Sequence, residues 1–233
     1  MEKAKRREFI KGGAVWAASA AVLGDMKLSA GQEKKDKDKE EEISPAEDLM
    51  REHGVLNRVL LIYDEMIRRL TGKGEFPPET LNAAARLIRR FIEDYHEKLE
   101  EDFLFPRFEK AGKLVDLVGV LRQQHQAGRR LTDAVQHRAT LTALKSADDR
   151  KHLANDLHLF IRMYRPHEAR EDTVLFPALR SIVSEHEYGA LGEDFEDKEH
   201  KLFGEDGFEK IVGEVAQLEK QLAVHDLAQF TPQ

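Results

Sequence analysis

The chain contains no cysteine, which excludes disulfide bonds, thiolate metal sites and a lipoprotein anchor. It also lacks a long apolar run: residues 12–24 are moderately apolar but shorter than the about 20 residues that span a bilayer, so we expect no transmembrane helix. An excess of positive charge is missing too, because the 233 residues have a formal net charge of −7. Residues 1–30 hold six Lys or Arg and three Asp or Glu, so the remainder carries about −10, which argues against nucleic acid as its partner.

The N-terminus resembles an export signal of the twin-arginine type. Arg6 and Arg7 are followed by apolar residues at positions 9 and 10 and by Lys11, and Leu-Ser-Ala at 28–30 offers a cleavage site. We therefore expect residues 1–30 to be a signal peptide that exports the folded, metal-loaded protein to the periplasm. The alternative is a basic tail on an amphipathic helix. Residues 31–43 are mostly Lys, Asp and Glu and predict a disordered, charged linker.

The remaining length suits one globular domain of ordinary size with extensions. Apolar residues recur every three or four positions in four segments, beginning near Ser44, Glu79, Leu114 and Ser146, and each segment therefore predicts a helix with one buried face. Short connections between them favour an all-α, antiparallel up-and-down four-helix bundle over residues 44–180. Residues 181–233 predict a C-terminal extension of one or two further helices.

Two prolines fall inside these predicted helices. Pro106 would clash with the carbonyl of Asp102, so the second helix should kink or stop there. Pro166 lies in the middle of the fourth helix, either as a tolerated kink or as a kink that aims His167, and the sequence leaves both possibilities open.

A repeated motif is the strongest signal of chemistry. It reads His-x-x-x-Glu-(Glu/Asp)-x-x-Leu-Phe-Pro, once from His96 and once from His167. Residues four apart in a helix differ by about 40° in rotation and about 6 Å in height, so His96 and Glu100 share a face, as do His167 and Glu171. One imidazole and one carboxylate from each of two helices predict a metal site inside the bundle.

Single histidines in the other two helices complete the pattern. His53 precedes His125 by 72 residues and His96 precedes His167 by 71, so the first two helices match the last two in layout. Four inward histidines and two carboxylates could therefore meet at one level of the bundle. Chance placement on the surface, or burial as ordinary core histidines, is the simpler alternative, but the periodicity puts these residues on or beside apolar stripes, where unpaired carboxylates are rarely tolerated.

For four neighbouring residues the spacing leaves alternatives open. Glu101 and Asp172 lie five positions after the motif histidines, a rotation of about 140°, so we expect them behind the ligands or on the surface. His200, in the extension, is either an additional ligand or an interhelical packing residue. Arg129, one turn after His125, either holds a bridging carboxylate or is solvated.

Residues 44–180 resemble the hemerythrin-like family, also called the HHE cation-binding domain. The resemblance rests on the two Leu-Phe-Pro tags and on six residues: His53, His96, Glu100, His125, His167 and Glu171. It implies a four-helix bundle holding two non-haem iron ions, bridged by Glu100 and Glu171 and by an oxo or hydroxo group, with the four histidines as terminal ligands. The tail after residue 184 is similar to the extension of bacterial members.

This resemblance implies a function in oxygen binding or sensing, iron holding, or the handling of nitric oxide or peroxide. Oxygen carriers of the family have a second histidine where this chain has Arg129, which leaves one iron short of a ligand unless water, His200 or a nearby tyrosine supplies it. We expect a di-iron protein that binds dioxygen or a related small molecule. The alternatives are a di-iron enzyme that reduces peroxide or nitric oxide, and iron holding without turnover. The sequence identifies no redox partner.

Two other metal proteins fit less well. A ferritin-like site needs Glu-x-x-His twice, and Glu93 supplies it before His96 while the matching position before His167 is Tyr164. A structural zinc site is also disfavoured, because such sites close with four ligands and are rich in thiolate.

Overall fold

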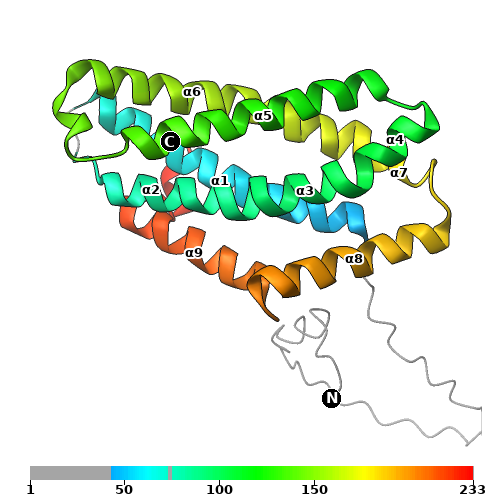
Figure 1. The fold of residues 1–233 in the computed structure, drawn as a ribbon. Helices are drawn as coiled ribbons and strands as arrows, with labels where there is room; N and C mark the ends of the chain where they lie inside the picture. Colours follow the sequence, from blue (N-terminus) through cyan, green and yellow to red (C-terminus); the bar gives the residue numbers. More distant parts are fainter. Residues whose placement is uncertain (1–42, 73–74, 233) are drawn as a thin grey trace, which may run out of the picture. The chain divides into compact units, whose positions relative to one another are not determined.

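The structure, a computed structural model, describes residues 43–72 and 75–232. The predicted signal peptide and nearly all of the predicted linker lie outside the described residues. Within the described ranges the chain is helical and contains no strand (Figure 1). The all-α bundle with extra C-terminal helices is therefore confirmed. No helix in the described part has both the length and the apolar character needed to cross a membrane.

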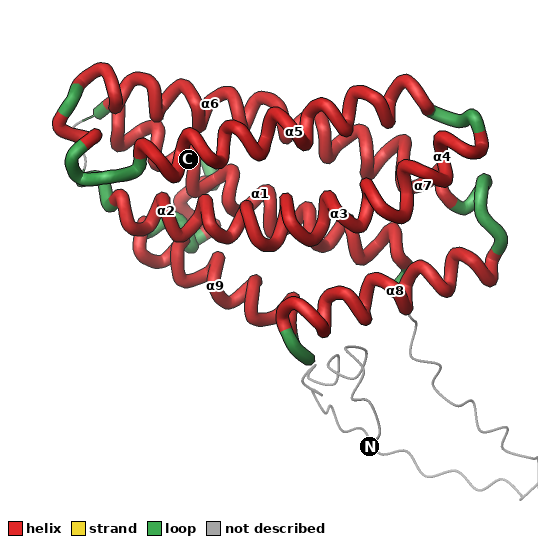
Figure 2. Tube along the Cα trace, viewed as in Figure 1, coloured by secondary structure: helices red, strands yellow, loops and turns green. Residues whose placement is uncertain are grey.

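Four long helices form the bundle. The first is α1 (Pro45–Thr71), and the third is α5 (Val115–Arg138). The second is built from consecutive segments: α2 (Pro78–Leu87), η2 (Ile88–His96), α3 (Glu97–Leu99), η3 (Glu100–Leu104) and α4 (Phe105–Ala111). The fourth consists of α6 (Ala147–Arg170), η5 (Glu171–Leu175) and α7 (Phe176–Leu179). Each long helix packs against its two neighbours in an up-and-down arrangement. Figure 2 shows the loops that join these helices at the two ends of the bundle.

Serine caps start three of the helices, two of them at the predicted starts near Ser44 and Ser146. The Ser44 hydroxyl accepts a hydrogen bond from the Glu47 amide, and Ser146 does the same for Asp149. Ser184 caps the first helix of the extension through Glu187. Each side chain satisfies one of the amides that a helix leaves unpaired in its first turn.

A wide π-helical turn precedes Pro106 in the second helix and Pro177 in the fourth. In these turns the amide of Phe105 donates to the carbonyl of Glu100, and that of Phe176 to Glu171, five residues back instead of four. Pro106 follows the first of these turns. The second helix does not stop there but continues through Pro106 to Ala111. Each extra residue in a turn rotates the rest of the helix about its axis, and such turns are frequent at functional sites.

The extra residue also changes which side chains are buried. The regular spacing predicts Val174 on the inner stripe, but Val174 is 38% exposed, whereas Leu175 and Phe176 are fully buried. This prediction is wrong because a period of 3.6 residues does not hold through η5. Pro166 lies inside α6, which runs through it to Arg170.

Two more helices cover one side of the bundle. They are α8 (Glu185–Phe203) and α9 (Gly207–Leu222), separated at Gly204, whose φ of 83° favours glycine. Both pack against α1, and α9 also packs against α2. Arg58 on α1 makes two hydrogen bonds to the Glu219 carboxylate, at 2.8 and 2.6 Å. A 3₁₀ turn, η6 (Leu227–Phe230), comes after α9.

Candidate metal centre

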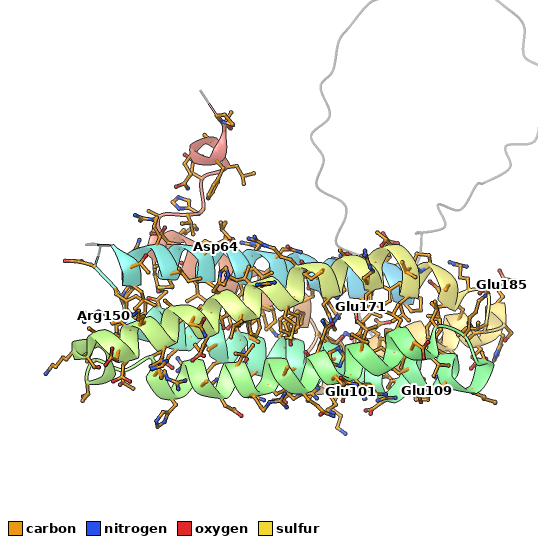
Figure 3. All side chains as sticks on the ribbon, turned by 90° about the horizontal axis from the view of Figure 1, so that it is seen from above. Asp64, Glu101, Glu109, Arg150, Glu171 and Glu185 are labelled. Atoms are coloured by element: carbon orange, nitrogen blue, oxygen red, sulfur yellow. The ribbon has the colours of Figure 1, made fainter. Side chains whose placement is uncertain are left out.

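The six predicted ligands come together inside the bundle. They come from all four long helices, with His96 ending η2, and Glu100 and Glu171 opening η3 and η5. Each of the six is at most 4% exposed. In Figure 3, Glu171 lies among the side chains between the helices. The residues that the motif and the repeat pair in sequence are thus neighbours in space.

The ligand atoms form two groups that share a carboxylate. In one group, atoms of Glu100, His125, His167 and Glu171 all lie within 4.8 Å of one another. In the other, atoms of His53, His96 and Glu100 do. Glu171 reaches this second group as well, with an oxygen 3.4 Å from Nε2 of His53.

Each carboxylate lies between a histidine of its own half and a histidine of the other half. Oε2 of Glu100 is 3.9 Å from Nε2 of His96 and 3.4 Å from Nε2 of His125. Oε2 of Glu171 is 3.2 Å from Nε2 of His167, in addition to its approach to His53. The site thus contains two pairs of histidines, and each of the two carboxylates lies between one histidine of either pair. Such a donor set suits two cations rather than one.

The carboxylate oxygens at the centre lack ordinary hydrogen-bond partners. Within the described residues, neither oxygen of Glu100 or Glu171 accepts a hydrogen bond, although both side chains are fully buried. Burial and the nearby charge of Glu171 raise the pKa of Glu100 well above its usual range. A buried charge of this kind is costly unless it is paired or binds a metal. The residues therefore fit a cation that this donor set could hold.

The outer nitrogen of each histidine faces a hydrogen-bond acceptor on another helix. The four pairs are His53 Nδ1 with Asp172 at 2.7 Å, His96 with Glu52 at 2.8 Å, His125 with Glu101 at 3.1 Å, and His167 with Gln124 at 2.9 Å. Such acceptors place the proton on Nδ1 and leave Nε2 free for a metal. In the metal-free protein, burial lowers the pKa of His53, but the hydrogen bond to Asp172 and the negative charges of Asp172 and Glu171 outweigh it and raise the pKa to about 10, so a cation at this position has to displace the proton on Nε2.

These observations agree with the comparison to known proteins. A family model described as the hemerythrin HHE cation binding domain matches residues 44–179. The chain belongs to this family. Two bacterial relatives, uncharacterized proteins of Mycobacterium bovis and Mycobacterium tuberculosis, are each 51% identical over 224 residues, covering 92% of this chain and 88% of the relative. No solved structure matches the chain.

Two acceptors of the hemerythrin domain come from the motif itself. Glu101 and Asp172, expected behind the ligands or on the surface, bind Nδ1 of His125 and His53 respectively. Each therefore serves a histidine of the opposite half. Sequence spacing along one helix could not predict this contact.

The other two acceptors, Glu52 and Gln124, are not predicted from the sequence. Each immediately precedes a ligand histidine, His53 or His125, and binds the histidine of the following helix. The one sequence feature that could have indicated them is that they occupy matching places in the internal repeat. They differ in charge, since one is a carboxylic acid and the other an amide.

The Leu-Phe-Pro tags also have a structural explanation. Phe105 stacks on the imidazole of His125 with ring centroids 5.5 Å apart, and Phe176 stacks on His53 at the same distance. Both phenyl rings are fully buried. Each tag thus supplies an apolar wall that restricts the orientation of a ligand from the other half of the hemerythrin domain.

A network of charges lies beside His125. The Arg129 guanidinium pairs with Glu97 at 2.7 Å and Glu101 at 2.8 Å, so Arg129 is engaged with carboxylates rather than solvated. The hydroxyl of Tyr164 donates to Glu97 at 2.6 Å. Burial raises the pKa of Glu97 to about 8, despite the hydrogen bond from Tyr164.

His200 lies apart from the metal-holding groups of the described residues. Its neighbour Glu199 is the buried residue on that turn of α8, and an oxygen of Glu199 lies within 4.8 Å of oxygens of Asp48 and Glu52. Among the described residues, the extension thus adds one acidic group near the acceptor of His96 rather than an imidazole near the centre.

Proposed function

We propose that this hemerythrin-family protein is a non-haem di-iron protein that binds dioxygen or a related small molecule. The observation that carries the proposal is the convergence of four buried Nε2 atoms on two carboxylates whose oxygens accept no hydrogen bond within the described residues. Every one of these histidines has its Nδ1 held by an acceptor, which is the arrangement that prepares imidazole to bind a metal.

Histidine and carboxylate donors without thiolate suit iron. In this proposal His53 and His96 would hold one ion and His125 and His167 the other, and Glu100 and Glu171 would contribute oxygens to both. When bound, the irons would supply a place for a small molecule to bind and exchange electrons. The protein's own contribution is to exclude water with Phe105 and Phe176 and to fix the imidazole rings.

The test of the ligand set is metal content. His53→Ala and Glu171→Ala should each lose iron, whereas His158→Ala, which removes an exposed histidine from the same helix as His167, should keep a full complement. A full iron complement in either ligand variant would refute the assignment.

The test of oxygen binding is the visible absorption spectrum of iron-loaded protein, reduced without oxygen and then exposed to air. A long-lived charge-transfer band that disappears under vacuum is the expected result. Rapid conversion to the diferric form without such a band would contradict reversible binding, and a spectrum that air leaves unchanged would refute any role in oxygen chemistry.

A second candidate is a di-iron enzyme that reduces peroxide or nitric oxide. It is favoured by Arg129, whose guanidinium is taken up by Glu97 and Glu101 and cannot serve as a ligand. With four histidines in place of five, one ion would keep an extra open position, which favours substrate chemistry over reversible binding. Sustained turnover of peroxide or nitric oxide by the purified iron-loaded protein would establish this function, and a single stoichiometric reaction would exclude it.

We also propose that the protein is exported by the twin-arginine route. The support is the sequence around Arg6 and Arg7. Replacing both arginines with lysine should leave the protein in the cytoplasm of the expressing cell, detected by fractionation. Unchanged export of this variant would refute the proposal.

A further inference from the structure

The two halves of the candidate centre are alike in geometry but differ in the charge of the groups that accept hydrogen bonds from their histidines. We call His53 with His96 position one, and His125 with His167 position two. Behind position one stand two carboxyl groups: Asp172 at 2.7 Å from His53 Nδ1, and Glu52 at 2.8 Å from His96 Nδ1.

Position two has a weaker set of acceptors. Nδ1 of His167 faces the amide oxygen of Gln124 at 2.9 Å, which carries no charge. Nδ1 of His125 faces Glu101, but that carboxylate is shared with Arg129 at 2.8 Å and with Lys98. The two cations offset the negative charge that Glu101 would otherwise contribute.

This difference bears directly on metal affinity. A carboxylate that accepts the Nδ1 proton makes the imidazole a stronger donor and adds negative charge near the cation, and removing such a partner typically costs about 10- to 100-fold in metal affinity. Oxygens of Asp48 and Glu199 lie within 4.8 Å of Glu52 on the side of position one. Glu97 lies as close to Glu101 on the side of position two, but the Arg129 guanidinium pairs with it at 2.7 Å.

Resting on the proposed function, we infer that the two metal positions are unequal: position one binds its divalent ion more tightly and fills first, and the pair Glu52 and Gln124 sets the difference. These residues occupy matching places in the internal repeat, each one position before a ligand histidine. Exchanging their chemistry therefore changes the charge behind one position while leaving all six ligands intact.

The experiment is an equilibrium titration of the metal-free, full-length protein with Co²⁺, followed by its visible absorption, and repeated with Fe²⁺ without oxygen. We expect two ions per chain in two resolved phases whose dissociation constants differ by about tenfold or more. His167→Ala should keep the tight phase and lose the weak one, and His96→Ala should do the reverse, which assigns each phase to its position.

Gln124→Glu should tighten the weak phase by about tenfold, and Gln124→Met should weaken it further. Glu52→Gln should weaken the tight phase by about tenfold. The matched control is Gln123→Glu, which adds the same charge at the adjacent, exposed position of α5 and should leave both phases unchanged. Circular dichroism of each metal-free variant verifies that it is folded.

Two equal phases in the natural protein, or a Gln124→Glu variant that binds like the Gln123→Glu control, would overturn the inference and leave the di-metal site standing. Binding of fewer than two ions to the natural protein would instead refute the proposed function itself. The two failures are therefore distinguishable in one titration.

Discussion

Replacing Gly128 with alanine should destabilise the protein, although alanine is the better helix former. A Cβ at this position of α5 would lie 2.0 Å from the hydroxyl oxygen of Tyr164 and 2.8 Å from its Cζ. Tyr164 is fully buried and donates to Glu97 at 2.6 Å, so its ring cannot move without breaking that hydrogen bond. Overpacking costs about 1–3 kcal/mol, and an unsatisfied buried group costs about 1–3 kcal/mol more.

Against this stands the gain in helix propensity, about 1 kcal/mol for Gly→Ala. The net expectation is a loss of about 1–5 kcal/mol in the free energy of unfolding of the metal-free protein, measured by urea denaturation. Gly119→Ala on the same helix is the control: a Cβ there meets nothing within 4 Å, so it should gain about 0.5–1 kcal/mol. If Gly128→Ala proved as stable as Gly119→Ala, the close packing of Tyr164 against α5 would be refuted.

Three further predictions concern the site and the extension. The pKa of His53 is raised to about 10 and that of Glu97 to about 8 in the folded protein, so their contribution to stability is lost as the pH rises through these values, at about 1.4 kcal/mol per pKa unit. The urea midpoint of the metal-free protein should therefore fall between pH 7 and 10, and a rise would contradict these shifts. Phe176→Leu should cost about 1–2 kcal/mol and weaken the ion held by His53 in a cobalt titration, and an unchanged affinity would show that the stacked ring has no part in binding. Arg58→Met should lower the free energy of unfolding by no more than about 1 kcal/mol, because the guanidinium is partly exposed, but it should speed amide hydrogen exchange in α9 by removing the ion pair with Glu219. Unchanged exchange would show that this ion pair does not hold α9.

Much of the fold is encoded in local sequence. The starts near Ser44 and Ser146 and the spacing of apolar residues predict where these helices begin and which face is buried, and both serines cap their helices. The prediction fails where the helix departs from 3.6 residues per turn. Val174 is predicted to lie inside and is exposed, because the π turn before Pro177 inserts one residue into the stripe.

The sequence points to six candidate ligands, which the structure brings together, but not to their surroundings. Four of the six lie in the repeated motif, and the matching layout of the two halves indicates the other two. The contacts of Glu101, Asp172, Glu52 and Gln124 join residues on different helices, so they depend on how the bundle is rotated and packed. The same holds for Phe105, whose ring stacks across the bundle on a histidine of the other half.

The number of iron ions bound per chain tests the central claim most directly. Native mass spectrometry of protein reconstituted with Fe²⁺ without oxygen should show two ions per chain, and Glu171→Ala should lose at least one of them. A natural protein that binds a single ion, or a Glu171→Ala variant that keeps two, would contradict a centre built from two histidine pairs and two shared carboxylates.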